Sequence, residues 1–294
     1  MIATNESRLI TMSVMGVVVS PGYPGIPAIP HQIDRDGKPR LLPMLGGIVY
    51  NVKLGDSVYG WAGDMIEPGV AIKAPDDAAN EALNVFACVG NEAVVMSGNA
   101  KGAKGIVTGK SGRFAEHVIL HFAPEVLDEL AFGDKIVVRA RGVGLTIDGF
   151  PGIFLKSLSP LVLDRLRPEE NDGRLTVPVT AVVPPELMGA GAGLTSEGGA
   201  ICIQSMDANA LARHGLDRLR LGDFVAVTDY DSSFGHGYKK GSVSLGVVSA
   251  TDSIRAGHGP GVTLVMTAPG GEIDPMIVDG MNLANLLDIA AASQ

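Results

Sequence analysis

Short runs of apolar and β-branched residues recur along most of the chain, and each run ends at glycine, proline or a polar cluster. Runs of roughly four to eight such residues, separated by turn-forming residues, are typical of β-strands. The predicted strands cover residues 14–20, 48–52, 93–96, 105–109, 115–122, 135–142, 175–183, 200–204, 224–231, 242–249 and 262–266. The pattern therefore predicts a protein built mainly of strands.

Helical periodicity occurs in only a few segments. The longest is 78–89, where Asp76 or Asp77 can cap the first turn and Gly90 ends the helix. Shorter helices are predicted where proline can occupy a first helical position or where a polar residue can cap the first turn. These starts are Pro124, Ser159, Asp207 and Asp274–Pro275.

One pattern of the form apolar-Gly-Asp-x-apolar occurs three times, at 54–58, 132–136 and 221–225. Glycine adopts the positive φ of a tight turn, and aspartate bonds to nearby backbone, so the pattern is typical of a turn that leads into a strand. The alternative is that the aspartates ligate a metal ion. The turn already explains each aspartate, so we favour the structural interpretation.

Composition agrees with a turn-rich β protein. The 294 residues include 39 glycines, 46% are hydrophobic, and only 5% are aromatic. We predict an α+β chain that is predominantly β, with barrel- or sandwich-like cores and a few short helices. The polar segment 167–173 (RPEENDG) is the best linker candidate, which gives an N-terminal domain at 1–167 and a C-terminal domain at 174–294.

Charge and targeting signals narrow the function classes. The formal net charge of −9 disfavours binding to a phosphate backbone, so nucleic acid is not an expected partner. Two cysteines, Cys88 and Cys202, are too few for a disulfide framework or a tetrathiolate metal site. The N-terminus lacks the basic segment of a signal peptide, and no apolar run reaches the length of a membrane helix. We expect a cytoplasmic protein.

Two loops in the first half carry candidate catalytic carboxylates. Asp64 and Glu67 lie between glycines and a proline, where they can converge for acid–base work or on a hard cation. Asn91 and Glu92 follow the predicted helix and are candidates for substrate binding and catalysis, respectively. Cys88 lies near the negative end of the same helix, which disfavours a reactive thiolate.

The segment 99–113 alternates glycines with lysines, and Lys110 is its candidate ligand-binding residue. Backbone N–H groups and lysines there can hold an anion, and the segment is weakly similar to RNA-contacting turns of ribosomal proteins. A plain glycine-rich hairpin is the alternative. A phosphate-binding P-loop is excluded, because Gly112 follows Gly109-Lys110-Ser111 where a helix should begin.

The second half offers a candidate metal site and a candidate proton donor or acceptor. Asp229, Asp231 and His236 follow a strand closely enough to bind Zn²⁺, Mn²⁺ or Ca²⁺. His258 is flanked by glycines, which leave the backbone open to a ligand, so we predict that it moves protons. The neighbouring substrate-binding candidates are Gly257, Gly259 and Gly261.

The motifs GWAGD, FACVGNEA, GIVTGKSG, MGAGAG, LRLGDFVAV and AGHGPGV occur in an order that resembles a bacterial and archaeal family, domain of unknown function 4438. The resemblance covers nearly the whole chain and implies two largely β domains without an established activity. In that family a histidine often follows the aspartate of GWAGD. Here the position is Met65, which supplies no imidazole.

The segment from Val183 to Asp231 is loosely similar to the acetamidase/formamidase family, through a Pro-Pro pair, a glycine-rich loop and a late Gly-Asp strand. That likeness implies hydrolysis of a small amide by metal-activated water. We therefore predict a metal-dependent hydrolase of a small polar amide, cyclic amide or similar carbonyl compound, and a homo-oligomer. The alternatives are a non-catalytic module that binds an anion or RNA through 99–113, or a purely structural homo-oligomer.

Overall fold

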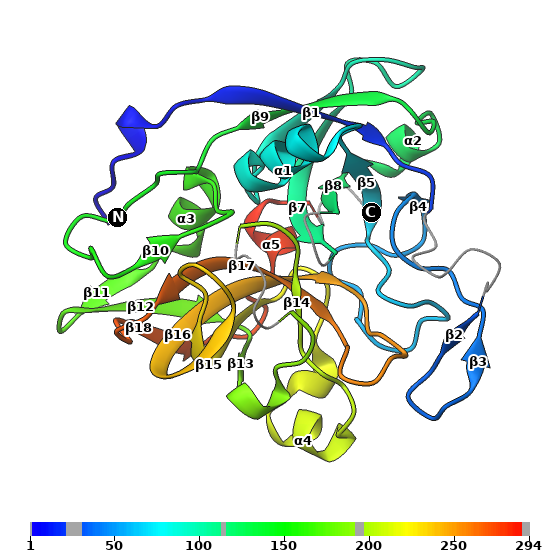
Figure 1. Cartoon of the computed structure of the whole chain (residues 1–294). Helices are drawn as coiled ribbons and strands as arrows, with labels where there is room; N and C mark the ends of the chain where they lie inside the picture. Colours follow the sequence, from blue (N-terminus) through cyan, green and yellow to red (C-terminus); the bar gives the residue numbers. More distant parts are fainter. Residues whose placement is uncertain (1, 22–30, 113–115, 192–196, 290–294) are drawn as a thin grey trace.

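A computed structural model describes residues 2–21, 31–112, 116–191 and 197–289. Strands dominate, and the helices are short, as the sequence predicts for an α+β chain that is predominantly β. Two large sheets make up the molecule, one in each half of the chain (Figure 1). No helix in the described part of the chain is both long and apolar enough to cross a membrane.

The first sheet closes into a six-stranded barrel. Antiparallel pairing joins neighbouring strands around it, and the circle closes where Val17 and Val18 pair with Lys73 and Ile72. In spatial order the barrel strands are β1 (Met12–Val18), β9 (Lys135–Ala140), β6 (Glu92–Val95), β7 (Lys104–Ser111), β8 (His117–His121) and β5 (Gly69–Lys73), with β4 (Ile48–Val49) added to β5. Closure removes the unpaired edges that an open sheet would expose.

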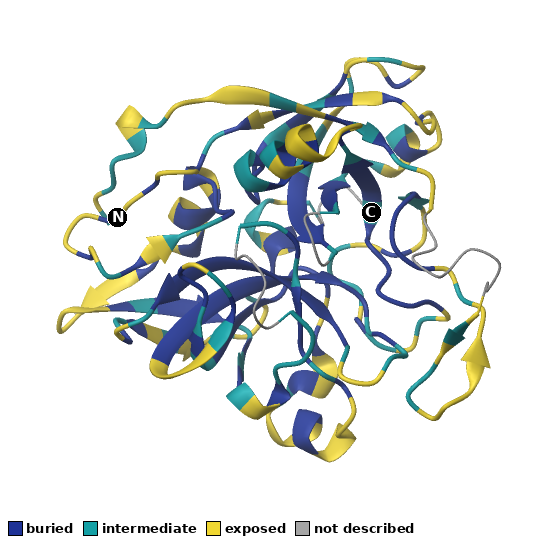
Figure 2. Ribbon diagram, viewed as in Figure 1, coloured by how far each residue is buried: buried dark blue, intermediate teal, exposed yellow. Residues whose placement is uncertain are grey.

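The second sheet belongs mainly to the other half of the chain. Its path is β10 (Phe154–Leu155), β17 (Gly261–Ala268), β16 (Gly237–Ala250), β15 (Phe224–Asp231) and β13 (Ala181–Val183), with β14 (Ile201–Cys202) also on β17. Every residue of β17 is buried, and β16 is exposed only over 238–241 (Figure 2). Apolar clusters on both faces bury this sheet.

Two smaller sheets change details of the predicted organisation. The candidate linker 167–173 contains β11 (Glu169–Asn171), which forms a hairpin with β12 (Arg174–Val179). The helix predicted at Asp274–Pro275 is wrong, because that segment is β18 (Ile273–Ile277), paired in parallel with β12. The remaining small sheet is β2 (Gln32–Ile33) with β3 (Pro39–Arg40).

Most predicted helix starts are confirmed, because local capping determines them. The side chains of Asp76, Ser159 and Asp207 each accept a backbone N–H in the first turn of the following helix. The helices are α1 (Asp77–Phe86), α2 (Pro124–Leu127), α3 (Pro160–Leu166), α4 (Ala208–Arg213) and α5 (Leu283–Leu286), with 3₁₀ turns at Glu6–Arg8, Pro185–Leu187 and Leu216–Arg218.

The three apolar-Gly-Asp repeats form the same turn. Their glycines, at 55, 133 and 222, have φ between 88° and 91°. The carboxylates of Asp56, Asp134 and Asp223 each accept the backbone N–H of the residue three positions earlier, at 2.8–2.9 Å. These contacts confirm the structural interpretation of the repeat, which leads the chain into a strand in the second and third copies.

The barrel and the second sheet meet along β7. Gly109 lies so close to Ser249 on β16 that a β-carbon at position 109 would clash with that side chain. The next residue, Lys110, donates its backbone N–H to Thr263 on β17 and accepts bonds at its carbonyl from Ser249 and Thr263. The junction therefore fixes the backbone of β7 against both strands.

Candidate functional site

Lys110 is completely buried at this junction. Its Nζ lies 2.6 Å from Ser157 Oγ and donates to the carbonyl of Glu197 at 2.9 Å. Burial of the amine lowers its pKa to about 8; the thiol of Cys88 and the carboxylate of Glu197 oppose the shift, and the Lys156 ammonium adds to it. A lysine with this pKa is partly neutral near physiological pH and can accept a proton.

Ser157 follows β10 and is held in an uncommon conformation. Its φ is +45°, a left-handed value that costs a non-glycine residue free energy. The carbonyl of Ser157 accepts the N–H of Val89 at 2.7 Å, which ties the turn to the end of α1. The surrounding structure thus holds the hydroxyl against the Lys110 amine.

Ser157 also lines a pocket of about 380 Å³. Most of the wall is apolar, and the polar side chains that line it are Thr146, Lys156, Ser157, Glu197 and Ser233. Lys156 is ion-paired with Glu197 at 2.5 Å and donates to the Ser233 carbonyl at 2.6 Å. The apolar lining includes Val85, Leu145, Ile147, Phe150, Ile153 and Phe154. Ser157 therefore contacts the buried amine and also lines a space that can hold a small molecule.

Of the residues predicted from the sequence, Lys110 belongs to this site. Asn91 has a structural contact instead: its side-chain oxygen accepts the backbone N–H groups of Cys88 and Arg141. Glu92 lies apart on β6, paired with Lys104 and Arg139.

Ser157 and Lys156 are functional candidates that the sequence does not predict. No motif around Lys156 and Ser157 in the sequence indicates them, because their contacts come from residues far along the chain.

The carboxylates predicted to act together, Asp64 and Glu67, are both buried but face different neighbours. Glu67 accepts bonds from Ser111 and from Gly46 N, and lies 3.0 Å from His117 Nδ1. Burial of the His117 ring opposes protonation, yet the bond and charge of Glu67 outweigh it and raise the pKa of His117. This pair links β8 to the loop before β5.

Asp64 faces the segment that leads to His258. Its Oδ1 accepts Ser253 Oγ at 2.6 Å and Ile254 N at 3.2 Å, and its Oδ2 lies 3.4 Å from Arg255 Nε. Two loops that are far apart in the sequence therefore meet. His258 itself bonds through Nδ1 to the Ala256 carbonyl, at 3.0 Å. Its proposed proton transfer stays a prediction.

The glycines around His258 lie against other backbone. The carbonyl of Gly257 accepts Ala190 N, and a β-carbon on Gly259 would clash with the Ile203 carbonyl. A β-carbon on Gly261 would lie 3.1 Å from Ala250 Cβ. Close packing between chain segments thus accounts for Gly259, and substrate binding by Gly257, Gly259 and Gly261 stays a prediction.

The metal candidates lie at the end of β15 and the turn after it. Asp229 Oδ1 accepts Gly241 N at 2.6 Å, Asp231 Oδ1 accepts Ser233 N and Oγ, and the His236 ring stacks on Tyr230. Within the described residues, no group of three or more His, Cys, Asp or Glu side chains is placed to hold a metal ion. The divalent cation stays a prediction, and the chemistry proposed below uses none.

The lysines of the segment 99–113 do not share one surface. Lys101 is exposed near the tip of the β6–β7 hairpin, Lys104 is paired with Glu92, and Lys110 is buried. Arg113 lies outside the described residues. The hairpin interpretation of this segment is therefore confirmed, and an anion at the surface would meet Lys101 and Lys104 without Lys110.

Comparisons with known proteins identify the family of this chain. Residues 31–164 match a family model described as domain of unknown function (DUF4438), N-terminal, and residues 165–287 match its C-terminal counterpart. A solved structure described as the crystal structure of TM1086 is 40% identical, with a TM-score of 0.91 over 97% of this chain and 98% of that one. No curated protein matches. This chain therefore belongs to the DUF4438 family, as the order of its motifs indicated.

Proposed function

We propose that the protein is a hydrolase of small esters or amides in which Ser157 is the nucleophile and Lys110 is its base. The observation that carries this proposal is the 2.6 Å contact between Ser157 Oγ and the fully buried Lys110 Nζ. A serine hydroxyl is a weak nucleophile until a neighbouring base removes its proton. Lys110 meets that need, because its pKa of about 8 leaves a neutral fraction at neutral pH.

The reaction would proceed in two steps. Ser157 Oγ attacks the substrate carbonyl carbon while its proton moves to Lys110 Nζ, and Lys110 then returns the proton to the departing alcohol or amine. Water next attacks the acyl-serine ester, with Lys110 taking a proton from water and giving it back to Ser157 Oγ. Each step conserves protons, and neither needs a cofactor.

Lys156 would act as a positioning residue for this base. Its ammonium helps to keep the pKa of Lys110 low, and it is itself held by Glu197 and the Ser233 carbonyl. The arrangement resembles enzymes in which one lysine is activated by a second cationic group. Lys110 therefore stays available as a proton acceptor while Lys156 carries the charge.

The pocket supports a substrate with an apolar acyl group. Its walls are mainly aliphatic and aromatic side chains, and its volume of about 380 Å³ suits a small molecule. This favours a less polar compound than the amide predicted from the sequence. The comparisons do not show the acetamidase/formamidase likeness, so an amide substrate stays a prediction from the sequence.

A fluorophosphonate reagent tests the nucleophile directly, because an activated serine Oγ displaces its fluoride and forms a stable phosphonate ester. We expect mass spectrometry to find the adduct on Ser157, and Ser157→Ala to abolish both labelling and hydrolysis of 4-nitrophenyl butyrate. Ser233→Ala is the matched control, since Ser233 lines the same pocket. His258→Ala separates this proposal from the proton transfer predicted for His258, because the Ser157–Lys110 mechanism does not need that imidazole and the variant would then keep its activity. Labelling elsewhere, or undiminished turnover by Ser157→Ala, contradicts the proposal.

A further inference from the structure

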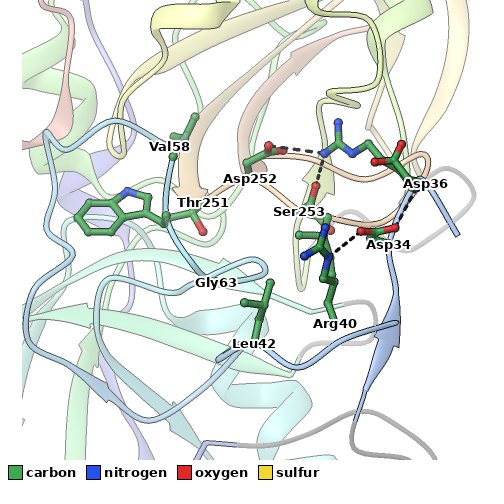
Figure 3. Close-up of a pocket in the computed structure, with 13 residues that line it drawn as sticks. Asp34, Asp36, Arg40, Leu42, Val58, Gly63, Thr251, Asp252 and Ser253 are labelled. Carbon is green, nitrogen blue, oxygen red and sulfur yellow. Dashed lines mark hydrogen bonds and ion pairs between the residues drawn. The ribbon is translucent and has the colours of Figure 1, made fainter. Parts of the chain in front are cut away.

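The pocket drawn in Figure 3 holds about 270 Å³ and shares no lining residue with the pocket beside Ser157. Two of its carboxylates already have partners. Asp34 pairs with Arg40 at 2.9 Å, and Asp252 accepts the Ser205 hydroxyl at 2.5 Å. The wall of the Ser157 pocket, in contrast, is mainly apolar, and apolar surface gains free energy when a ligand covers it. The Ser157 pocket is therefore the better place for a ligand.

Two phenylalanines lie together at the Ser157 pocket. Phe154, on β10, lines the pocket and is 39% exposed. Phe234 belongs to the turn between β15 and β16 and is 85% exposed, more than any other large apolar side chain in the described part of the chain. The centroids of the two rings are 6.3 Å apart, and the ring planes are tilted by 57°. The pair therefore presents aromatic surface to solvent beside the pocket.

Hydrogen bonds fix the turn that carries Phe234. The N–H and the hydroxyl of Ser233 both donate to Asp231 Oδ1, at 2.9 and 2.6 Å. The carbonyl of Ser233 accepts Lys156 Nζ at 2.6 Å, and Lys156 directly precedes Ser157 in the chain. The backbone beside Phe234 is thus tied to the segment that carries the proposed nucleophile. A ligand that contacts the phenyl ring would lose little free energy to the ordering of a loop.

The angle between the two rings favours an aromatic ligand over an alkyl one. Aromatic rings attract one another in offset-stacked and tilted arrangements, beyond the gain from buried area. A third ring that stacks on Phe154 or Phe234 is itself tilted by 57° to the other, so it can meet both phenylalanines in favoured arrangements. An alkyl chain would gain only from the area that it covers.

We propose that Phe154 and Phe234 hold an aromatic ring of the substrate, so that the protein prefers neutral esters or amides with an aryl-bearing acyl group. The ligand is neutral because Lys156 and Glu197, the charged side chains of this pocket, form an ion pair with each other. The inference rests on the proposed hydrolase function for the position of the carbonyl group at the nucleophile. The ring site itself depends only on the pocket and the phenyl pair.

Isothermal titration calorimetry with two neutral ketones, 4-phenylbutan-2-one and 4-cyclohexylbutan-2-one, tests the ring site without turnover. We expect saturable binding of the phenyl ketone. Phe234→Ala should lower the ratio of phenyl to cyclohexyl affinity about two- to tenfold, the usual contribution of an aromatic pair beyond its buried area. Phe132→Ala, the same change at an exposed position outside the pocket, should leave the ratio unchanged. Phe234→Leu, which keeps an apolar side chain without a ring, should lower it as well and decides the question if circular dichroism shows Phe234→Ala to be unfolded.

Hydrolysis measures the same preference in turnover. Phe234→Ala should lower kcat/KM for 4-nitrophenyl phenylacetate relative to 4-nitrophenyl cyclohexylacetate by the same factor, while the fluorophosphonate still labels Ser157. An intact phenyl preference in binding without any labelling of Ser157 would reject the hydrolase and confirm the ring site. Labelling and turnover with a ratio that Phe234→Ala leaves unchanged would overturn the ring site.

Trp61 reports binding at the wrong place. It is the single tryptophan of the chain and lines the pocket of Figure 3, so its fluorescence should stay constant while the phenyl ketone saturates the protein. A saturable change in that fluorescence that persists unaltered in Phe234→Ala would assign the ketone to the Figure 3 pocket and overturn the proposal, as would the absence of saturable binding.

Discussion

Lys110 Nζ and Ser157 Oγ lie 2.6 Å apart although they come from opposite sides of the junction between the two sheets. Lys110 is on barrel strand β7, and Ser157 follows β10 of the second sheet. The contact exists because Gly109 allows β7 to approach β16 closely, and because the bonds of Lys110 to Thr263 and Ser249 set the direction of the strand. The packing of the two sheets thus creates the pair.

The first prediction concerns the pH dependence of hydrolysis. Only neutral Lys110 accepts the Ser157 proton, so kcat/KM for 4-nitrophenyl butyrate should rise with pH and level off above about 8. Lys110→Met should lower kcat/KM about 10²- to 10⁴-fold, the usual contribution of a general base, and remove this rise. A variant that keeps the same pH dependence would show that another group is the base.

A second prediction concerns stability. The pKa of Lys110 is about 8 in the folded protein and 10.5 as its ordinary value, so between these pH values the unfolded chain binds more protons. The free energy of unfolding should therefore rise with pH across this window, by about 3 kcal/mol from this one group. Lys110→Met should lack that contribution.

Urea unfolding of the unmodified protein and of Lys110→Met at pH 7.5 and pH 10 gives the difference between their free energies of unfolding at each pH. Groups that titrate in both proteins cancel from this difference. Lys101→Met, a change of the same chemistry at an exposed position, should follow the unmodified protein at both pH values. Parallel behaviour of Lys110→Met and the unmodified protein would mean that Lys110 is not buried as described.

The third prediction concerns the buried Glu67–His117 pair. The pKa of His117 is raised in the folded protein, so the pair stabilises the fold fully below the ordinary value of 6.5, and this stabilisation is lost as pH rises through the raised value. Glu67→Gln should cost about 2 kcal/mol at pH 5.5, the usual worth of a hydrogen bond to a charged group, and less at pH 9.

Denaturant unfolding at the two pH values checks this, and an NMR titration of the His117 ring should show a lower pKa in Glu67→Gln than in the unmodified protein. Equal losses at both pH values would assign the role of Glu67 to its bonds with Ser111 and Gly46 instead.

The sequence predicts what local chemistry determines. Asp76, Ser159 and Asp207 cap helices through bonds within one turn, and the apolar-Gly-Asp turns close through the residue three positions earlier. Most strands follow from their β-branched runs. The predicted set lacks the barrel strand β5 and the short strands β2, β3, β10 and β11. It also lacks β18, where parallel pairing with β12 outweighs the helix-start signal of Asp274–Pro275.

The candidate sites depend on contacts that no local pattern contains. Lys110 and Ser157 are separated by 47 residues, and Asp64 and Ser253 by 189. The sequence indicates Lys110 through its glycine neighbours, of which Gly109 serves close strand packing. Polar loops that converge on one place are common in proteins, but the contact of Asp64 with the loop before His258 depends on the tertiary structure.

The last prediction compares two glycines that the sequence analysis treated alike as ligand-binding. A β-carbon on Gly259 would collide with the Ile203 carbonyl and lie 3.0 Å from Ser205 N, whereas Gly257 has open space but a φ of +70°. Gly259→Ala should therefore lower the free energy of unfolding by about 3 kcal/mol or more through overpacking, and Gly257→Ala by about 1 kcal/mol through backbone strain. Urea unfolding of the two variants under one condition measures both changes. If Gly259→Ala is as stable as the unmodified protein but no longer binds a substrate, Gly259 serves a ligand after all, and the packing explanation is wrong.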